Sequence, residues 1–474
     1  MAKTLHTSFH FKSCRYGLLI LLGCMTLVSC LRREEEIRIL FTGDILLSRQ
    51  VKKEYDYRNE SPWKDLKPLF HAADLVIGNL EGAVGTVSEP VAPSGSPIFA
   101  INGVDIALLS EAGFNVIGIE NNHSYDLGHT GKQNTITRLL ENGIHPVCFE
   151  NSPYFISVNG LVLSIVTVNI VPGANYSENP MYSLELKQKL RLARSLANMV
   201  VVSIHWGSEL LEWTDKTQRE AAKWLIAQGV DVIIGSHPHI IQKPDIIDGK
   251  PVFFSLGNHL FDQKYPATKR GLIVEITVKN GKYRCAGIIT NTASNSFYPK
   301  PAESVSFDFP AFTYNSNLFN INGYSLIPVS VFERNESRVV LEAYRDNLLK
   351  WRSHPMPLTH ISSAKLDGNE EYILALQNYY STIDKEVDIR PYVYAVDSHG
   401  MYSKWRGSAL AYPLLDARIS PYNSRVLCAL HRSDSYIALD KKTTHTRIAA
   451  YEWNGFGFSG LPDSAARESC EDVF

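Results

Sequence analysis

Short apolar runs alternate with longer amphipathic segments from Ile37 to about Thr292. Most runs are rich in β-branched residues and are bounded by Gly, Asn or Asp, as is typical of strands. The predicted strands are Ile37–Phe41, Leu75–Ile77, Val116–Ile119, Val162–Val168, Met199–Ile204, Val230–Ile234 and Val252–Ser255.

Helices are predicted between these strands. They cover Ile106–Ala112, Gln133–Asn142 with Gly143 as C-cap, and Thr217–Ala227 with Asp215 as N-cap and Gly229 past its end. The strand–helix alternation predicts an α/β domain over residues 37–292, in which helices flank a β core.

The pattern changes after about Thr292. Residues 293–365 are rich in Ser, Pro, Asn and Phe at their start and are expected to form a loop-rich connecting region, with a short helix over Val339–Trp351. Residues 366–474 are expected to form a smaller antiparallel β domain, because Gly, Asp and Asn punctuate short apolar runs there. Its predicted strands include Tyr392–Val396, Ser424–Leu430, Tyr436–Leu439 and Thr446–Trp453.

Composition adds limits to this picture. The 474 residues are 45% hydrophobic and 20% charged, which indicates a globular chain of two to three domains. A formal net charge of -2 gives no basic field, so nucleic acid is not expected as a partner. No Cys-x-x-Cys pair occurs, which argues against zinc-finger or redox motifs. Disulfides could form in an exported protein, but the spacing specifies no pairing among Cys148, Cys285, Cys428 and Cys470.

The N-terminus has the pattern of an export signal. Basic residues precede the apolar run Gly17–Val28, which is short for a membrane-spanning helix. The run ends in Leu27-Val28-Ser29-Cys30, which resembles the lipobox of bacterial lipoproteins, in which the cysteine carries the lipid. We therefore expect residues 1–30 to be a lipoprotein signal peptide, Cys30 to be lipidated and residues 31–36 to be a tether. The alternative is a simple cleaved signal with a chance cysteine.

An acylated Cys30 would anchor the protein to a membrane. The expected location is the cell envelope, facing the periplasm or the cell exterior. By resemblance to Gram-negative lipoproteins, Leu31 in place of Asp favours the outer membrane.

Polar clusters follow most of the predicted strands. They are Gly43-Asp44, Asn79-Leu80-Glu81, Asn121-Asn122-His123, His205-Trp206-Gly207-Ser208-Glu209, Gly235-Ser236-His237-Pro238-His239 and Gly257-Asn258. Strand ends are where ligand sites assemble in α/β sheets. Taken singly, each has an ordinary structural interpretation: a helix cap for Asp44, a loop carboxylate for Glu81, a core histidine for His205. Asp126 is expected to cap a following helix, and Trp206 is expected to pack.

Taken together, the clusters favour metal chemistry. Two imidazoles two residues apart, on a Gly-led turn after a buried strand, can point into neighbouring coordination sites. The candidate ligands are Asp44, Glu81, Asn122, His205, His237 and His239. This mixed N/O set suits Mn, Fe or Zn and exceeds what one tetrahedral zinc needs. We therefore expect two divalent metal ions that share a bridging carboxylate.

The ordered motifs strongly resemble the CapA family of capsule and poly-γ-glutamate synthesis proteins, a branch of the calcineurin-like metallophosphoesterase superfamily. The resemblance implies a four-layer α-β-β-α sandwich. It implies that Asp44 and Asn122 ligate metal, that His239 ligates the first metal, and that His205 and His237 ligate the second. It further implies that Glu81 takes the position of the bridging carboxylate, which is usually an aspartate. It also implies that His123 helps to protonate a leaving group.

Two positions depart from the wider superfamily. Leu46 stands where most of its phosphoesterases have a histidine ligand, a loss that CapA-like sequences commonly share. His259 occupies a slot where many relatives have Phe, and it is expected to be a surface residue rather than an extra polar contact.

The resemblance favours a metal-dependent hydrolase or transferase that supports synthesis of a capsule or poly-γ-glutamate type polymer. Glu209 and Arg49 are candidates to orient the substrate, although a solvated Arg49 is the plainer interpretation. Expected partners are an envelope polymer or its precursor, the membrane through the lipid anchor, and capsule-synthesis membrane proteins. The alternative is a non-catalytic assembly, export or binding factor with a degenerate metal site.

Overall fold

The computed structural model describes residues 36–86, 97–173, 179–368, 370–382, 385–407, 410, 413–432 and 446–474. The expected signal peptide with Cys30, and the predicted strand Tyr436–Leu439, lie outside these residues. Among the described residues, no helix combines the length and apolar character that a membrane crossing needs.

The first sheet is mixed and has β1 near its centre. Its parallel half runs from β1 through β2 and β5 to β6, and its antiparallel half runs from β1 through β16 and β17 to β18. The strands are β1 (Ile37–Ile45), β2 (Leu75–Leu80), β5 (Val116–Gly118), β6 (His145–Val147), β16 (Arg270–Lys279), β17 (Lys282–Asn291) and β18 (Lys300–Ser306), with β15 (Asn258–Leu260) beside β1 and β19 (Phe312–Thr313) beside β17.

The second sheet has the order β12-β13-β10-β9-β8-β7, and its central strands β13, β10, β9 and β8 are parallel. Its strands are β7 (Tyr154–Val158), β8 (Leu161–Asn169), β9 (Met199–His205), β10 (Val232–Ser236), β12 (Asp245–Ile247) and β13 (Lys250–Phe253). Alternate residues of each strand face opposite layers. On β8, Leu163 and Ile165 pack between the sheets, whereas Val162 and Val166 face the helices.

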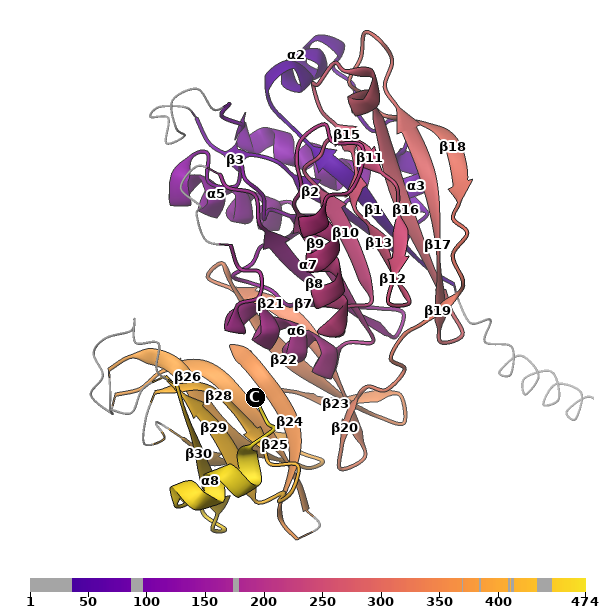
Figure 1. The fold of residues 1–474 in the computed structure, drawn as a ribbon. Helices are drawn as coiled ribbons and strands as arrows, with labels where there is room; N and C mark the ends of the chain where they lie inside the picture. The colour runs from indigo at the N-terminus through magenta and orange to yellow at the C-terminus, as the bar shows by residue number, and fades with distance from the viewer. Residues whose placement is uncertain are drawn as a thin grey trace, which may run out of the picture.

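Helices cover the outer face of each sheet, which gives four layers (Figure 1). The first sheet is covered by α2 (Arg49–Arg58), α3 (Lys67–His71), α4 (Ala107–Ala112) and α5 (Gly128–Glu141), and the second by α6 (Leu184–Leu196) and α7 (Lys216–Ala227). Asp215 and Gln218 form a capping box at the start of α7, as the sequence predicts for Asp215. The predicted α-β-β-α sandwich is confirmed, and the predicted helix segments belong to α4, α5 and α7.

The rest of the chain is mostly β structure, as predicted, and consists of antiparallel sheets whose neighbouring strands follow one another along the chain. The strands are β20 (Phe319–Ile321), β21 (Tyr324–Glu333), β22 (Glu336–Arg345), β23 (Leu348–Arg352), β24 (Leu358–Asp367), β25 (Glu370–Tyr380), β26 (Val387–Val396), β27 (Met401–Arg406), β28 (Leu414–Ile419), β29 (Val426–His431), β30 (Arg447–Trp453) and β31 (Phe458–Gly460), followed by α8 (Asp463–Cys470). A disulfide joins Cys428 on β29 to Cys470 at the end of α8.

Two expectations for this part are wrong. The segment 293–365 is not loop-rich, because β18 to β23 and most of β24 lie in it. Val339–Trp351 is not a helix but spans β22 and β23. Val339, Leu341 and Ala343 are buried at every second position, which is strand periodicity.

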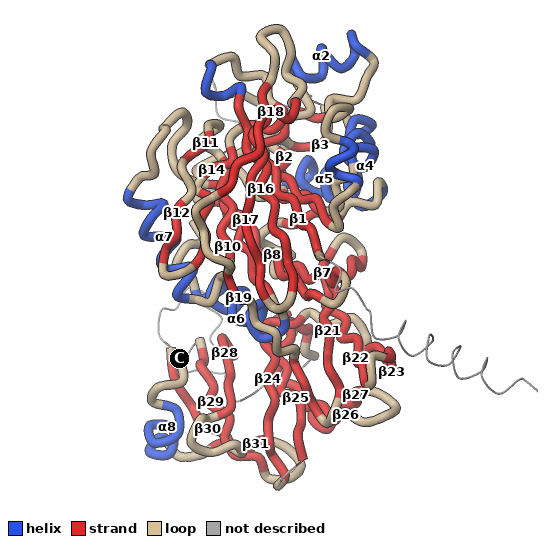
Figure 2. The backbone as a smooth tube through the Cα atoms, turned by 90° about the vertical axis from the view of Figure 1, so that its right-hand side faces the viewer, coloured by secondary structure: helices blue, strands red, loops and turns tan. Residues whose placement is uncertain are grey.

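Helix α6 lies at the junction between the sandwich and the C-terminal strands (Figures 1 and 2). Its buried leucines, Leu186 and Leu190, belong to the same apolar core as β22 and β24 residues. Arg191 of this helix also pairs with the fully buried Asp416 of β28 at 2.7 Å. The C-terminal strands are thus docked through α6, on the side of the second sheet that faces away from the first.

Candidate metal centre

The candidate ligands meet at the carboxyl ends of the parallel strands of both sheets. Asp44 lies near the end of β1, Glu81 directly follows β2, and Asn122 lies in the turn after β5. His205 is the last residue of β9, and His237 begins the turn after β10. Strands from two sheets therefore contribute to one site, which agrees with the expectation from the spacing of the motifs.

The two carboxylates are fully buried. Asp44 follows Gly43, and the backbone of Gly257 passes close to Gly43. A Cβ at position 43 would lie 1.9 Å from the Gly257 carbonyl oxygen, so only glycine fits there. The Asp44 N–H donates to that same oxygen at 3.0 Å. An oxygen of Asp44, an oxygen of Glu81 and a ring nitrogen of His239 lie within 4.8 Å of one another. These three residues could therefore hold one ion.

His205 and Asn122 form the opposite side of the cage. His205 Nε2 lies 2.8 Å from Asn122 Oδ1 and 3.7 Å from Glu81 Oε1. Its ring centroid lies 4.8 Å from that of His237. Glu81 thus lies between the pair His205 and Asn122 on one side and Asp44 with His239 on the other, as a bridging carboxylate would.

The turn after β10 places two imidazoles in the site through unusual backbone geometry. His237 has φ +96° and His239 has φ +60°, values that L-residues rarely adopt. The His237 N–H donates to Asp44 Oδ2 at 3.2 Å, and His239 Nε2 lies 3.9 Å from Glu81 Oε2. Such strain persists only where the surrounding structure holds it, and it is common at functional sites.

Unsatisfied buried atoms show that a cation fits this cage. Both oxygens of Glu81 and Nδ1 of His237 are buried without a hydrogen-bond partner among the described residues. A buried carboxylate without a partner costs several kcal/mol, in the range of about 3–5. Burial raises the pKa of Glu81 well above its usual range, and the neighbouring Asp44 raises it further. A divalent ion would supply the missing positive charge.

The histidines differ in how their surroundings affect protonation. Burial lowers the pKa of His205 well below its usual range and that of His237 to about 4, and the neighbouring imidazoles add to both effects. Burial also acts to lower the pKa of His239, but Glu81 and Asp44 outweigh it and raise that pKa to about 9. His205 and His237 are therefore neutral at pH 7, which is the form that binds metal.

Hydrogen bonds outside the cage fix the ring orientations. Asn258 Nδ2 donates to Gln263 Oε1 and to the Thr268 carbonyl, so its Oδ1 faces His239 Nδ1 at 2.9 Å. In the neutral ring this leaves Nε2 of His239 as the ligand atom. Ser236 Oγ lies 2.8 Å from Nδ1 of His205, which likewise leaves Nε2 of His205 as the ligand atom.

A chain of amides links the first sheet's contributions. Asn79 Nδ2 donates to Asp44 Oδ1 at 2.8 Å, and Asn121 Nδ2 donates to Asn79 Oδ1 at 3.1 Å. Asn121 Oδ1 then accepts the N–H of His123 at 3.1 Å. Asn79 and Asn121 lie in the same motifs as the predicted ligands, but the motifs alone did not predict this supporting role.

Asp126 does not cap a helix, which corrects the expectation from its position before Gly128. The N-cap of α5 is Leu127, without a side-chain bond. Asp126 Oδ2 instead accepts from the Phe99 N–H at 2.7 Å and lies 2.9 Å from His123 Nδ1. A carboxylate bound to Nδ1 leaves Nε2 of His123 to face the site, and no described residue hydrogen-bonds to that atom.

Leu46 lies in a small apolar cluster beside the cage. It packs with Phe99 and Phe261, and all three are buried. The Phe99 ring stacks on His123 at 3.8 Å, and the Phe261 ring centroid lies 4.6 Å from that of His239. The side of the site at Leu46 is therefore closed by hydrocarbon.

His259 is buried, so the expectation of a surface residue is wrong. Only 1% of it is exposed, and its Nε2 accepts from Trp63 Nε1 at 2.9 Å. Burial lowers its pKa to about 3, so the ring is neutral. It lies on β15, whose pairing with the central strand β1 places it inside the fold.

The two candidate substrate residues differ in their surroundings. Arg49 Nε lies 3.1 Å from Asp262 Oδ2, and its guanidinium carbon lies 5.1 Å from the Phe99 ring centroid. Glu209 is exposed, and one of its carboxylate oxygens lies within 4.8 Å of ring nitrogens of both His237 and His239. Trp206 packs, as expected: it is fully buried and stacks on Phe254.

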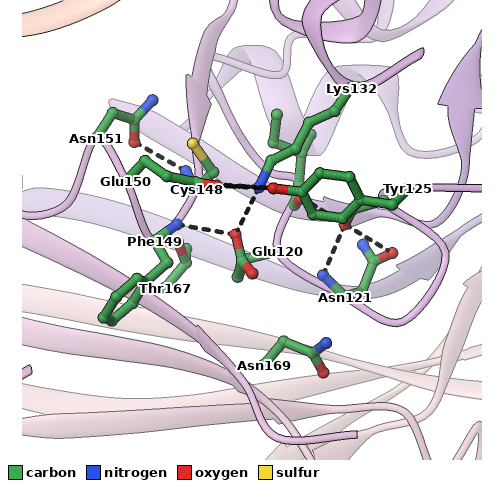
Figure 3. Close-up of polar contacts among 12 residues, drawn as sticks. Glu120, Asn121, Tyr125, Lys132, Cys148, Phe149, Glu150, Asn151, Thr167 and Asn169 are labelled. Carbon is green, nitrogen blue, oxygen red and sulfur yellow. Dashed lines mark hydrogen bonds and ion pairs between the residues drawn. The ribbon is translucent and has the colours of Figure 1, made fainter. Parts of the chain in front are cut away.

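An ionic cluster around the buried Lys132 and Glu120 lies beside the turn that carries Asn122 and His123, and Figure 3 shows this cluster. Lys132 of α5 reaches Glu120, directly before this turn, at 3.2 Å and both oxygens of Glu150 at 2.9 Å. Glu120 also accepts the Phe149 N–H at 2.9 Å. Burial acts to lower the pKa of Lys132, but the carboxylates outweigh it and raise that pKa, so Lys132 stays charged. The cluster ties the turn to α5 and to the segment after β6.

Comparison with known proteins matches this part of the chain to capsule biosynthesis. Residues 38–263 match the family described as bacterial capsule synthesis protein PGA_cap. The chain is 28% identical over 264 residues to the PGA biosynthesis protein CapA of Bacillus subtilis (strain 168), covering 52% of this chain and 68% of that protein. It is 28% identical over 294 residues to the capsule biosynthesis protein CapA of Bacillus anthracis, covering 58% and 71%.

The matched residues contain every candidate ligand, from Asp44 to His239, and the fold that carries them is the sandwich that the motifs predicted. On these grounds, residues 38–263 belong to the family described as bacterial capsule synthesis protein PGA_cap.

Proposed function

We propose that this chain is a metal-dependent hydrolase or transferase that supports the synthesis of a capsule or poly-γ-glutamate type polymer at the cell envelope. The observation that carries the proposal is the cage around Glu81. Its two buried oxygens lack hydrogen-bond partners among the described residues. Nε2 of His205 and Nε2 of His239 lie 3.7 and 3.9 Å from these oxygens, and a carboxylate oxygen of Asp44 lies within 4.8 Å of one of them. Such a cage has no structural purpose without a cation, because an unpaired buried carboxylate destabilises the fold.

Two divalent ions would supply Lewis acidity for hydrolysis at a phosphorus or amide carbon. One ion would be held by Asp44, Glu81 and His239, and the other by Glu81, Asn122, His205 and His237. Within the chain, His123 is placed to deliver a proton to the leaving group from Nε2. Asp126 contacts the other ring nitrogen and so fixes the orientation of the ring. Arg49 could orient an anionic substrate only by changing or sharing its contact with Asp262.

One observation favours a second function, a non-catalytic assembly or export factor. Leu46 and its apolar cluster replace a ligand of the metal that His239 holds, which would weaken that site. Under this proposal the remaining cage would bind a single ion or a polymer carboxylate without turnover.

Metal content and hydrolysis together distinguish the two functions. The purified chain, dialysed against Mn²⁺, is expected to hold two ions per chain and to cleave bis-(p-nitrophenyl) phosphate or a γ-glutamyl peptide. His237→Ala should lose one ion and the activity. His399→Ala, at an imidazole whose side chain is 91% exposed, serves as the matched control. Metal content near zero in the unaltered chain, or equal activity in His237→Ala, would refute catalysis.

The location is a proposal as well: an acyl chain on Cys30 holds the protein on the envelope, beside capsule-synthesis membrane proteins and the polymer or its precursor. The signal-like N-terminus supports this placement, and so does the Cys428–Cys470 disulfide, because disulfides persist in oxidising compartments. Labelling of cells with radioactive palmitate should mark the protein and fail to mark Cys30→Ser. Equal labelling of both would contradict the lipid anchor.

A further inference from the structure

Glu209 occupies an unusual place for an exposed carboxylate. One of its oxygens lies within 4.8 Å of ring nitrogens of His237 and His239, the two imidazoles of the turn after β10. No described residue forms a hydrogen bond or ion pair with its carboxylate. The group is therefore not used by the fold, although its position beside two candidate ligands is well defined.

The backbone that carries Glu209 is strained, and the strain has no packing purpose. Leu210 adopts φ +61°, a conformation that L-residues rarely adopt, yet the residue is exposed, at 43%, and is not part of the buried core. Its N–H donates at 2.9 Å to the carbonyl of Pro238, between His237 and His239. The consequence of this strained residue is that Glu209 is held against the histidine turn.

Buried amides fix the rest of the same loop. Gln242 is fully buried, and its Nε2 donates to the carbonyls of Leu211 and Trp213 at 2.9 and 3.1 Å. Gln218 of α7, also fully buried, donates to Gln242 Oε1 at 2.9 Å. The loop is therefore preorganised rather than free to swing Glu209 away from the site.

We infer that Glu209 is a metal ligand and that it replaces the ligand lost at Leu46. Both residues lie near His239. Leu46 packs with Phe261, whose ring centroid lies 4.6 Å from the imidazole, and an oxygen of Glu209 lies within 4.8 Å of a His239 ring nitrogen. A carboxylate oxygen is a suitable substitute for imidazole on Mn²⁺, Fe²⁺ or Zn²⁺. This inference rests on the proposed metal centre and changes the role of Glu209 from substrate orientation to coordination.

The test measures Mn²⁺ binding to the metal-stripped full chain by titration calorimetry and by elemental analysis after dialysis. Glu209→Gln keeps the size of the side chain and removes its charge. We expect one of two sites to weaken by at least about tenfold, the smallest effect that even outer residues of metal sites have. Glu212→Gln, an exposed carboxylate on the same loop, is the matched control and should bind like the unaltered chain.

A second variant tests the compensation directly. Leu46→His in the Glu209→Gln background restores the histidine that the wider superfamily carries, and it should recover the tight second site. Two sites of unchanged affinity in Glu209→Gln would overturn the inference while leaving the metal centre intact. No recovery in the double variant would overturn the compensation for Leu46. No Mn²⁺ binding by the unaltered chain would instead overturn the metal centre itself.

Discussion

Replacing Lys132 by Met tests whether the ionic cluster beside the candidate site holds the fold in place. The side chain of Lys132 is 7% exposed, and that of Glu120 is 2% exposed. Met keeps most of the apolar stem and removes only the charge. Glu120 would then retain the Phe149 N–H as its partner but would lose its only cation in the cluster.

The expected loss is large because an uncompensated buried charge remains. Removing one partner of a buried ion pair costs about 3–5 kcal/mol. Glu150 contributes less to the penalty, since its side chain is 56% exposed and water can replace the lysine there. We therefore expect the free energy of unfolding to fall by about 3–5 kcal/mol at pH 7, chiefly through Glu120.

The penalty should depend on pH in a definite direction. Burial raises the pKa of Glu120, and Lys132 lowers it in part. Without Lys132 the folded-state pKa rises further above the unfolded value, so the folded state binds more protons in that window. Stability of Lys132→Met should therefore recover as pH falls and decline as pH rises.

Urea unfolding followed by tryptophan fluorescence measures this loss, provided that the m-value is unchanged. The double variant Lys132→Met, Glu120→Gln removes both charges and should recover most of the stability, because a neutral buried pair lacks the desolvation penalty. A loss below about 1 kcal/mol in the single variant, the value of an exposed pair, would refute the reasoning. A double variant no more stable than the single would refute it as well.

Three further predictions concern other parts of the fold. His259→Gln keeps an acceptor for Trp63 but removes the titrating ring. Because burial lowers the His259 pKa to about 3, acid should destabilise the unaltered chain more than this variant between about pH 6.5 and pH 3. Thermal unfolding of both chains at several pH values measures the difference. Asp126→Asn should lower phosphodiester turnover by about 10²–10⁴-fold without changing metal content, because His123 loses its orienting carboxylate; unchanged turnover would contradict this role. Cys428→Ser should destabilise the C-terminal strands by about 4 kcal/mol, the entropy of a loop of 42 residues, and equal denaturant midpoints with and without reductant would contradict it.

Much of the site was predictable because its residues sit at strand ends. The apolar runs before Asp44, Glu81, His205 and His237 became strands of two sheets, and parallel strands bring their carboxyl ends to one edge. Spacing alone could therefore group these residues. It could not show which oxygens remain unpartnered, since that depends on the packing of two sheets against each other.

The surroundings of Asp126 and His259 were harder to predict from the sequence. Asp126, three residues after His123 and two before Gly128, has the spacing of a helix cap, and only the fold shows that its carboxylate turns back to the imidazole. His259 follows a Gly-Asn pair, which is typical of a loop, but pairing of β15 with β1 buries it. In both cases the local pattern was compatible with two environments, and a distant segment decided between them.

The buried pair of oxygens on Glu81 also bears on how the cage folds. A carboxylate without a partner in this environment must be neutralised either by a proton or by a cation. Burial and the neighbouring Asp44 raise its pKa, whereas a bound ion would favour the ionised form. Metal binding, proton release and stability are therefore linked at this residue. The apolar cluster of Leu46, Phe99 and Phe261 borders the same site, because Phe99 stacks on His123 and the Phe261 ring lies against His239.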